Sequence, residues 1–196
     1  MGPALLLASN SPRRRELLSE AGFEFETFGP DVAESFDPHL TLRELTALNA
    51  TRKSLAAARA LPGKVVLAAD TLVAIHDRIL GKPKDLAEAV AMLERLSGEV
   101  HEVCTSVFIC HLARAKSLSF SEISRVRFRR LNSDRIERYL SKVNTLDKAG
   151  AYAAQGFGRE IIEEIDGSFT NVVGLPMEKT VTALAEFGVV PNLEAS

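Results

Sequence analysis

Three consecutive arginines, Arg13–Arg15, follow a short polar turn that leads from an apolar segment into a predicted helix. The turn contains Ser9 and Ser11, and Pro12 suits the first helical position. Adjacent arginines repel one another, and they are unfavourable at the positive end of a helix dipole. Hydroxyls, backbone N–H groups and guanidinium groups at a helix N-terminus can instead bind phosphate. We interpret this segment as a phosphate-binding turn; the alternative is a solvated basic first turn.

An acidic residue, Asp70, follows the apolar run Val65–Ala69. This run predicts a buried strand that ends at Asp70 and Thr71. Carboxylates at the carboxyl ends of strands in α/β sheets commonly line ligand sites. Asp70 could therefore hold a divalent metal or activate a water molecule. The alternative is a turn residue at the end of a strand.

Two later loops carry further side chains suited to nucleotide chemistry. Lys82 lies in a loop stiffened by Pro83, and Gln155 lies in the glycine-rich stretch 150–158. A lysine offsets charge that develops on phosphate, and glycines let a backbone approach a ligand closely. A glutamine amide can both donate to and accept from the edge of a base. Plain surface loops are the alternative, but together these features are typical of nucleotide hydrolysis.

Several common sites are absent from the sequence. It has no G-x-x-x-x-G-K-[ST] phosphate loop, no complete dinucleotide fingerprint and no zinc-ligand spacing. We expect the four scattered histidines to be surface or space-filling residues: His39, His76, His101 and His111. The tripeptide Asn49-Ala50-Thr51 matches a glycosylation acceptor, but we discount it because it lies inside a predicted helix.

The composition is that of a globular protein. The 196 residues are 46% hydrophobic and 26% charged, which is enough to bury a real core. The formal net charge of −2 argues against a general nucleic-acid binder, and no apolar run is long enough to span a membrane.

Because the start, Met1–Pro3, runs almost directly into a strand, we expect no signal peptide. Cys104 and Cys110 are too far apart along one predicted strand for a disulfide, so we expect buried thiols and a cytoplasmic location.

Strands and helices alternate along the chain. The predicted strands cover residues 5–8, 23–26, 65–69, 101–109, 118–128 and 160–165. Predicted helices begin at Pro12, at the capping box Thr41–Glu44, at Asp85, at Ser133 and at Pro176, the last ending near Phe187. The second of these helices carries an apolar stripe that includes Leu45 and Leu48. Strands 101–109 and 118–128 are expected to pair antiparallel, so the pattern predicts an α/β fold with a mixed sheet.

Six sequence blocks, in order and over nearly the whole chain, resemble the Maf proteins, which are nucleoside triphosphate pyrophosphatases. The blocks are Ala8–Arg14 with Glu16–Leu18, Ala69–Thr71, Gly81–Pro83, Leu96–Gly98, Asp147–Tyr152 and Asn171–Pro176. The resemblance implies a single domain over residues 1–196, with a mixed twisted β-sheet flanked by helices and two lobes that enclose a cleft. It also implies cleavage between the α and β phosphates with Mg²⁺ or Mn²⁺, and the blocks are similar to the branch that acts on dTTP and UTP.

The resemblance further implies roles for individual residues. Asp70 matches the proposed proton acceptor, and it would hold the metal together with Glu34. Positions tied to substrate choice are Arg13, Thr71 and Gln155. Other positions expected to line the cleft are Ser9, Arg14, Lys53 and Lys82, with Arg13, Arg14 and Lys82 assisting catalysis.

Some features depart from the family or leave other functions open. Gly81 stands where many members carry Glu, and Ala154 where Ile is common.

One alternative function is that of a non-catalytic nucleotide-binding regulator of cell division, which would bind nucleotide without releasing pyrophosphate. Another is a phosphatase of a different type, which would release orthophosphate. The expected partners are a nucleoside triphosphate and, from the resemblance, a possible second copy of the chain; no nucleic acid or membrane is expected.

Overall fold

The computed structural model describes residues 4–76 and 78–192, so Met1–Pro3 and the expectation that no signal peptide precedes the first strand lie outside it. The strands are β1 Leu5–Leu7, β2 Phe25–Thr27, β3 Val65–Ile75, β4 Arg78–Leu80, β5 Val100–His111, β6 Lys116–Phe128 and β7 Ile162–Asp166. The α-helices are α1 Pro12–Glu20, α2 Leu42–Ala60, α3 Leu86–Leu96, α4 Ser133–Leu140, α5 Phe169–Val173 and α6 Met177–Ala185. Short 3₁₀ helices are η1 Leu112–Arg114, η2 Ala149–Ala151 and η3 Gly156–Glu160. Within the described ranges, every helix is too short or too polar to cross a bilayer.

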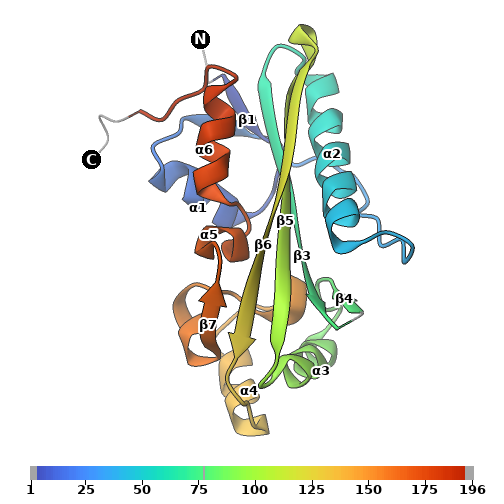
Figure 1. Ribbon diagram of the computed structural model, residues 1–196, viewed down its shortest axis with the longest axis vertical. Coiled ribbons are helices and arrows are strands. Elements are labelled where there is room, and N and C mark those ends of the chain that lie inside the picture. Colours follow the sequence, from blue (N-terminus) through green and yellow to red (C-terminus); the bar gives the residue numbers. More distant parts are fainter. Residues whose placement is uncertain (1–3, 77, 193–196) are drawn as a thin grey trace. The chain divides into compact units, whose positions relative to one another are not determined.

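The strands form one mixed sheet, in the order β2-β1-β3-β5-β6-β7, with β4 paired to β3 (Figure 1). β1 runs parallel to both β2 and β3, whereas β4 and β7 pair antiparallel with β3 and β6. β5 and β6 are neighbours joined only by residues 112–115, a connection too short for a parallel crossover, so they form the expected antiparallel pair. The predicted α/β fold with a mixed sheet flanked by helices is confirmed.

The chain divides into two compact units. The first contains residues up to Asp70 together with 105–122 and those from Gly174 onward. The second contains Thr71–Cys104 and Ile123–Val173. The three long strands β3, β5 and β6 each contribute residues to both units.

In the first unit, α2 packs on the sheet through small side chains. Its Ala57 and Ala58 join a buried cluster with Leu6, Ala8, Val66, Ala68 and Cys110. The expected stripe is only partly correct, because Leu45 is buried but Leu48 is 39% exposed. The buried face of α2 instead includes the polar residues Thr46, Asn49 and Ser54. Apolar periodicity in the sequence does not indicate this buried face, because alanine and polar residues make up most of it.

Strand β3 differs from the prediction in a way that concerns Asp70. Its expected end at Asp70 and Thr71 is wrong, because the strand continues to Ile75 and pairs there with β4. The apolar residues 72–75 explain the extension. Pairing with the parallel strand β1 nevertheless stops at Leu67, so Asp70 lies beyond the carboxyl end of β1. This is the position at which α/β sheets commonly present ligand-binding groups.

The remaining boundary differences are smaller. The strand expected over 23–26 is formed by Phe25–Thr27, and that expected over 160–165 by Ile162–Asp166. The last helix ends at Ala185, and α5 was not predicted because five residues are too few for a helical pattern. Neither Cys104 nor Cys110 forms a disulfide, and both are buried, as expected.

In the second unit, three aromatic rings pack edge to face. His101 contacts Phe128 and Tyr152, with ring centroids 4.9 and 5.3 Å away, and its Nε2 lies 2.8 Å from the Tyr152 hydroxyl. Burial lowers the pKa of His101 from 6.5 to about 4. The same burial raises the pKa of Tyr152. This space-filling role for His101 is of the kind expected for the scattered histidines.

The protonation of His101 makes stability depend on pH. Above pH 6.5 the ring is neutral in the folded and unfolded chain, but below it only the unfolded chain gains the proton. We therefore expect the free energy of unfolding to fall between pH 6.5 and about 4, by an amount on the order of 3 kcal/mol. Urea denaturation at several pH values measures this loss. His101→Gln should reduce the slope and the exposed His39→Gln should not; equal slopes in all three proteins would contradict the assignment.

Candidate active site

The polar turn before α1 holds Arg14 in a defined position. Ser9 Oγ accepts hydrogen bonds from the Ser11 backbone N–H at 3.2 Å and from Arg14 Nη1 at 3.2 Å. Arg14 Nε donates to the Gly174 carbonyl oxygen at 2.8 Å. Two of the sequence blocks, Ala8–Arg14 and Asn171–Pro176, therefore meet at Arg14.

The electrostatic surroundings of Arg14 include both acidic residues predicted for the site. Burial lowers the pKa of the Arg14 guanidinium, and the charge of Arg13 lowers it further. The carboxylates of Asp70 and Glu34 act in the opposite direction and raise this pKa. The basic turn and the two carboxylates thus share one electrostatic environment.

Lys53 joins the two carboxylates directly. Its Nζ lies 2.6 Å from Asp70 Oδ1 and 2.6 Å from Glu34 Oε1. The side chains of Lys53 and Asp70 are only 13% and 5% exposed, so solvent screens this pair weakly. The ammonium group of Lys53 therefore neutralises the Asp70 carboxylate at close range.

Asn49 is a second partner of Asp70, and the sequence reasoning missed it. Its Nδ2 donates to Asp70 Oδ2 at 3.2 Å and to the Ser35 carbonyl oxygen at 3.2 Å, while its Oδ1 accepts from the Ser35 backbone N–H at 2.7 Å. The buried amide therefore links Asp70 to the loop that carries Glu34. Its burial also supports discounting Asn49 as a glycosylation site.

Helix α2 positions both partners of Asp70. The predicted capping box begins the helix: the Glu44 N–H donates to Thr41 Oγ1, and the Thr41 N–H donates to Glu44 Oε2. Asn49 and Lys53 lie four residues apart, so they project from one face of the helix. This spacing places the two polar side chains on one face, but it does not identify Asp70 as their shared partner.

The loop between β2 and α2 is anchored at several points. The Phe28 N–H donates to the Leu7 carbonyl oxygen at 2.9 Å. A Cβ added at Gly29 would lie 2.1 Å from Asn10 Oδ1, so a larger residue there would displace the exposed Asn10 side chain. With the Ser35–Asn49 bonds, these contacts fix the segment that carries Glu34.

The second unit contains the other three predicted site residues. Thr71 follows Asp70 directly in β3, Lys82 is exposed in the segment between β4 and α3, and Gln155 is half-buried just before η3. Two sequence blocks meet here, because the Gly150 N–H donates to the Gly81 carbonyl oxygen at 3.0 Å. Gly150 has a φ of +69°, and an added Cβ would lie 3.1 Å from Val73 Cγ2, so this position requires glycine.

The structure thus groups the predicted residues unevenly. Within the first unit, Ser9 bonds to Arg14, and Lys53 joins Glu34 to Asp70; the charges of Asp70, Glu34 and Arg13 all act on the pKa of Arg14. Thr71, Lys82 and Gln155 belong to the second unit.

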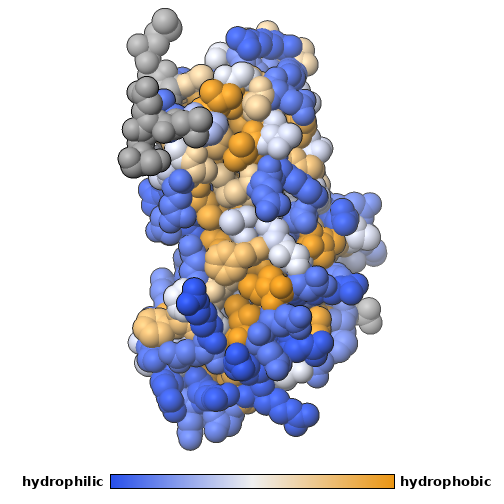
Figure 2. All heavy atoms as spheres, turned by 60° about the vertical axis from the view of Figure 1, so that its left-hand side comes forward, coloured by the Kyte–Doolittle hydropathy of each residue, from blue (hydrophilic) through white to orange (hydrophobic). Residues whose placement is uncertain are grey.

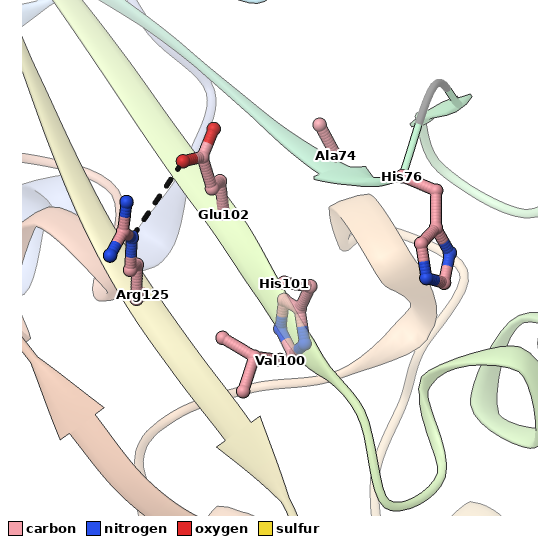
Figure 3. A pocket seen from close by; sticks show the side chains of 6 residues that line it. All are labelled: Ala74, His76, Val100, His101, Glu102 and Arg125. Atoms are coloured by element: carbon pink, nitrogen blue, oxygen red, sulfur yellow. Dashed lines mark ion pairs between the residues drawn. The ribbon is translucent and has the colours of Figure 1, made fainter.

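A hollow of about 360 Å³ in the second unit contains none of the predicted site residues. Figure 3 shows its lining side chains: Ala74, His76, Val100, His101, Glu102 and Arg125. Arg125 Nε lies 3.9 Å from Glu102 Oε1, so the two opposite charges in this wall face each other. Such a wall offers little net charge to an ionic ligand.

Known proteins resemble this chain over almost its full length. The family model described as Maf-like protein matches residues 4–187. A protein of Shouchella clausii named dTTP/UTP pyrophosphatase is 43% identical over 96% of this chain and 97% of its own length. One of the same name from Bdellovibrio bacteriovorus is 42% identical over 95% of this chain and 100% of its own length. The solved Ham1 protein of Staphylococcus aureus aligns with 93% of this chain and 96% of its own at 16% identity and a TM-score of 0.47. From the family match and the two sequence relatives, the chain belongs to the Maf-like protein family.

Proposed function

We propose that this protein hydrolyses nucleoside triphosphates, with dTTP and UTP as substrates, and releases the monophosphate and pyrophosphate. One observation carries the proposal: a buried carboxylate, Asp70, is held by Lys53 and Asn49 in the electrostatic environment of Arg14. Such a network offers cations for phosphate beside a carboxylate that can take a proton. The choice of dTTP and UTP as substrates rests on the names of the two relatives.

Each residue of the first unit has a role in this proposal. Ser9, Arg13 and Arg14 bind phosphate oxygens, using the hydroxyl and the guanidinium donors. Asp70 accepts a proton from the water that attacks the α-phosphate. Lys53 orients Asp70, and it offsets negative charge as the bond to the leaving pyrophosphate breaks.

The residues of the second unit would complete the reaction. Lys82 offsets charge on the phosphate chain. Thr71 and Gln155 select the base, because a side-chain amide can donate to and accept from the edge of a pyrimidine. The two units would thereby act as a single Maf-like domain over residues 1–196.

A divalent cation fits the acidic residues of the first unit. Among residues 4–76 and 78–192, no group of three His, Cys, Asp or Glu side chains is suited to hold a metal. Mg²⁺ needs no such group, because it is commonly held by one or two carboxylates together with substrate phosphates. Asp70 and Glu34, both bound to Lys53, would be those carboxylates. When bound, Mg²⁺ or Mn²⁺ would neutralise charge on the phosphate oxygens.

The proposal also covers the location of the protein and its oligomeric state. The two buried free thiols, Cys104 and Cys110, suit the reducing cytoplasm. The family resemblance suggests a homodimer, which light scattering of the purified protein would detect as twice the chain mass.

The proposed reaction is tested by its products. Canonical and modified triphosphates are incubated with the protein and Mg²⁺ or Mn²⁺, and orthophosphate is measured with and without added inorganic pyrophosphatase. We expect orthophosphate from dTTP and UTP only when pyrophosphatase is added. Orthophosphate without it would indicate a different phosphatase, and tight binding without any product would indicate a non-catalytic nucleotide regulator.

Asn49 should act on the rate rather than on substrate binding. Its amide orients Asp70 but is buried beneath it, so we expect Asn49→Ala to lower kcat about tenfold with little change in KM. Thr46→Ala is the matched control, since Thr46 is equally buried on α2 but bonds to Ser106 at 2.7 Å. Steady-state kinetics with dTTP separates the two. If both variants lost kcat equally, Asn49 would have only a structural role.

Gln155 should determine base choice more than rate. We expect Gln155→Ala to reduce the preference for dTTP over purine triphosphates about tenfold, while the best kcat changes less. Comparing kcat/KM across the four deoxynucleoside triphosphates measures the preference. An unchanged ranking of substrates would exclude this role for Gln155.

A further inference from the structure

Four arginines surround a second hollow, of about 350 Å³, in the second unit. Arg129 follows β6, Arg135 and Arg138 lie on α4, and Arg159 lies in η3. Glu160 and the buried Ile161 complete the lining. Figure 2 shows hydrophilic side chains gathered at the level where Figure 1 labels α4. We call this site, with its four arginines, the arginine hollow.

The backbone holds the arginine hollow together. The Arg129 N–H donates to the Ile161 carbonyl oxygen at 2.8 Å, which ties the end of β6 to the segment after η3. Arg135 and Arg138 are three residues apart on α4, so their side chains share one face of that helix. Arg135 Nη1 also donates to the Arg130 carbonyl oxygen at 3.3 Å, which limits where its guanidinium can lie.

The four arginines of this hollow outnumber the single acid in its wall. Within the part of the chain that the structure describes, none of the four guanidinium groups has an ion pair with a carboxylate. The one acid in the wall, Glu160, already pairs with Lys142 at 3.0 Å. In the hollow of Figure 3, by contrast, the single arginine faces a glutamate.

Four like charges around one hollow repel one another, and an anion removes that repulsion. Guanidinium groups bind phosphate oxygens in pairs, and several together favour ligands with more than one phosphate. The charges surround a single concave site rather than follow an extended stripe, which favours a compact anion over a nucleic-acid strand. We propose that the arginine hollow, whose lining shares no residue with the Asp70 network, binds an oligophosphate, namely inorganic pyrophosphate or the phosphate chain of a nucleotide.

Site-resolved NMR of the full-length protein tests this proposal. Without divalent metal, ¹H–¹⁵N spectra are recorded while inorganic pyrophosphate, dTTP or thymidine is added. We expect pyrophosphate and dTTP to shift the amide signals of residues 158–161, and thymidine, which lacks phosphate, to leave them unchanged. The ratio of the affinities for pyrophosphate and dTTP shows which of the two binds the hollow more tightly. Raising the salt from about 50 mM to about 200 mM should weaken both, because these charges are exposed.

Charge-removing variants give the decisive comparison. Arg135→Gln with Arg138→Gln should weaken the effect on residues 158–161 about tenfold or more. Arg159→Gln removes a charge from a different element, η3, and should also weaken the effect. Its result therefore separates the loss of charge from any disturbance of α4. Arg43→Gln with Arg52→Gln removes two exposed arginines from α2 and should change nothing. Shifts that survive the hollow variants, or shifts with thymidine alone, would each overturn the proposal.

Discussion

Asp70→Asn should lower kcat for dTTP by about a thousandfold and leave the fold intact. The amide is nearly the same size as the carboxylate, but it cannot accept the proton of the attacking water. Asp70 is only 3% exposed, and the amide oxygen of the variant can still accept a hydrogen bond from one of its two donors, Lys53 and Asn49, which anchors the side chain. Initial rates and the circular dichroism spectrum of the variant measure the two effects.

A carboxylate elsewhere provides the control for Asp70. Asp166 lies at the end of β7 and is exposed, so Asp166→Asn removes the same charge without touching the network. We expect that variant to keep its rate within about twofold. An Asp70→Asn protein that turned over dTTP at the normal rate would show that another group accepts the proton.

Lys53→Met should harm both stability and activity. It leaves Asp70 and Glu34, whose oxygens both lie 2.6 Å from Lys53 Nζ, as two carboxylates without the cation between them. Breaking a buried pair in this way costs about 3 kcal/mol of unfolding free energy. We expect kcat to fall about a hundredfold as well, because Asp70 loses its position. Urea denaturation and initial rates measure the two losses.

Lys64 offers a matched control for Lys53. It also pairs with a glutamate of the first unit, Glu26 at 3.0 Å, but the two side chains are 24% and 44% exposed. Solvent weakens such a pair, so Lys64→Met should cost less than about 1 kcal/mol and leave kcat unchanged. Equal losses of stability in the two variants would contradict the view that burial makes the Lys53 network strong.

The sequence predicted those elements whose signals are local. The capping box Thr41–Glu44 forms with both of its bonds, and Pro12 begins α1 as expected. These features depend on residues a few positions apart, which a single sequence displays directly. The order of strands and helices likewise followed from runs of apolar residues, and it gave the correct fold class.

The contacts that assemble the candidate site join distant residues, and local patterns do not reveal them. Asn49 reaches Asp70 from 21 positions away, and Arg14 reaches Gly174 from 160 positions away. The sequence does not reveal that Asn49 is buried, since a polar residue within a helix usually indicates an exposed face.

The roles of Glu34 and Lys53 came from the family resemblance alone. Their loop and helix carry no phosphate or metal motif, so composition and spacing gave no reason to select them. The bond between Lys53 and Glu34 now supplies a physical argument for considering them together with Asp70.

The central claim is that water attacks the α-phosphate of a nucleoside triphosphate, and isotope labelling tests it most directly. The protein hydrolyses dTTP with Mg²⁺ in water enriched in ¹⁸O, and the products are separated and analysed by mass spectrometry. The proposed mechanism places the ¹⁸O in thymidine monophosphate and leaves pyrophosphate unlabelled. Label in pyrophosphate, or release of orthophosphate as the first product, would contradict it.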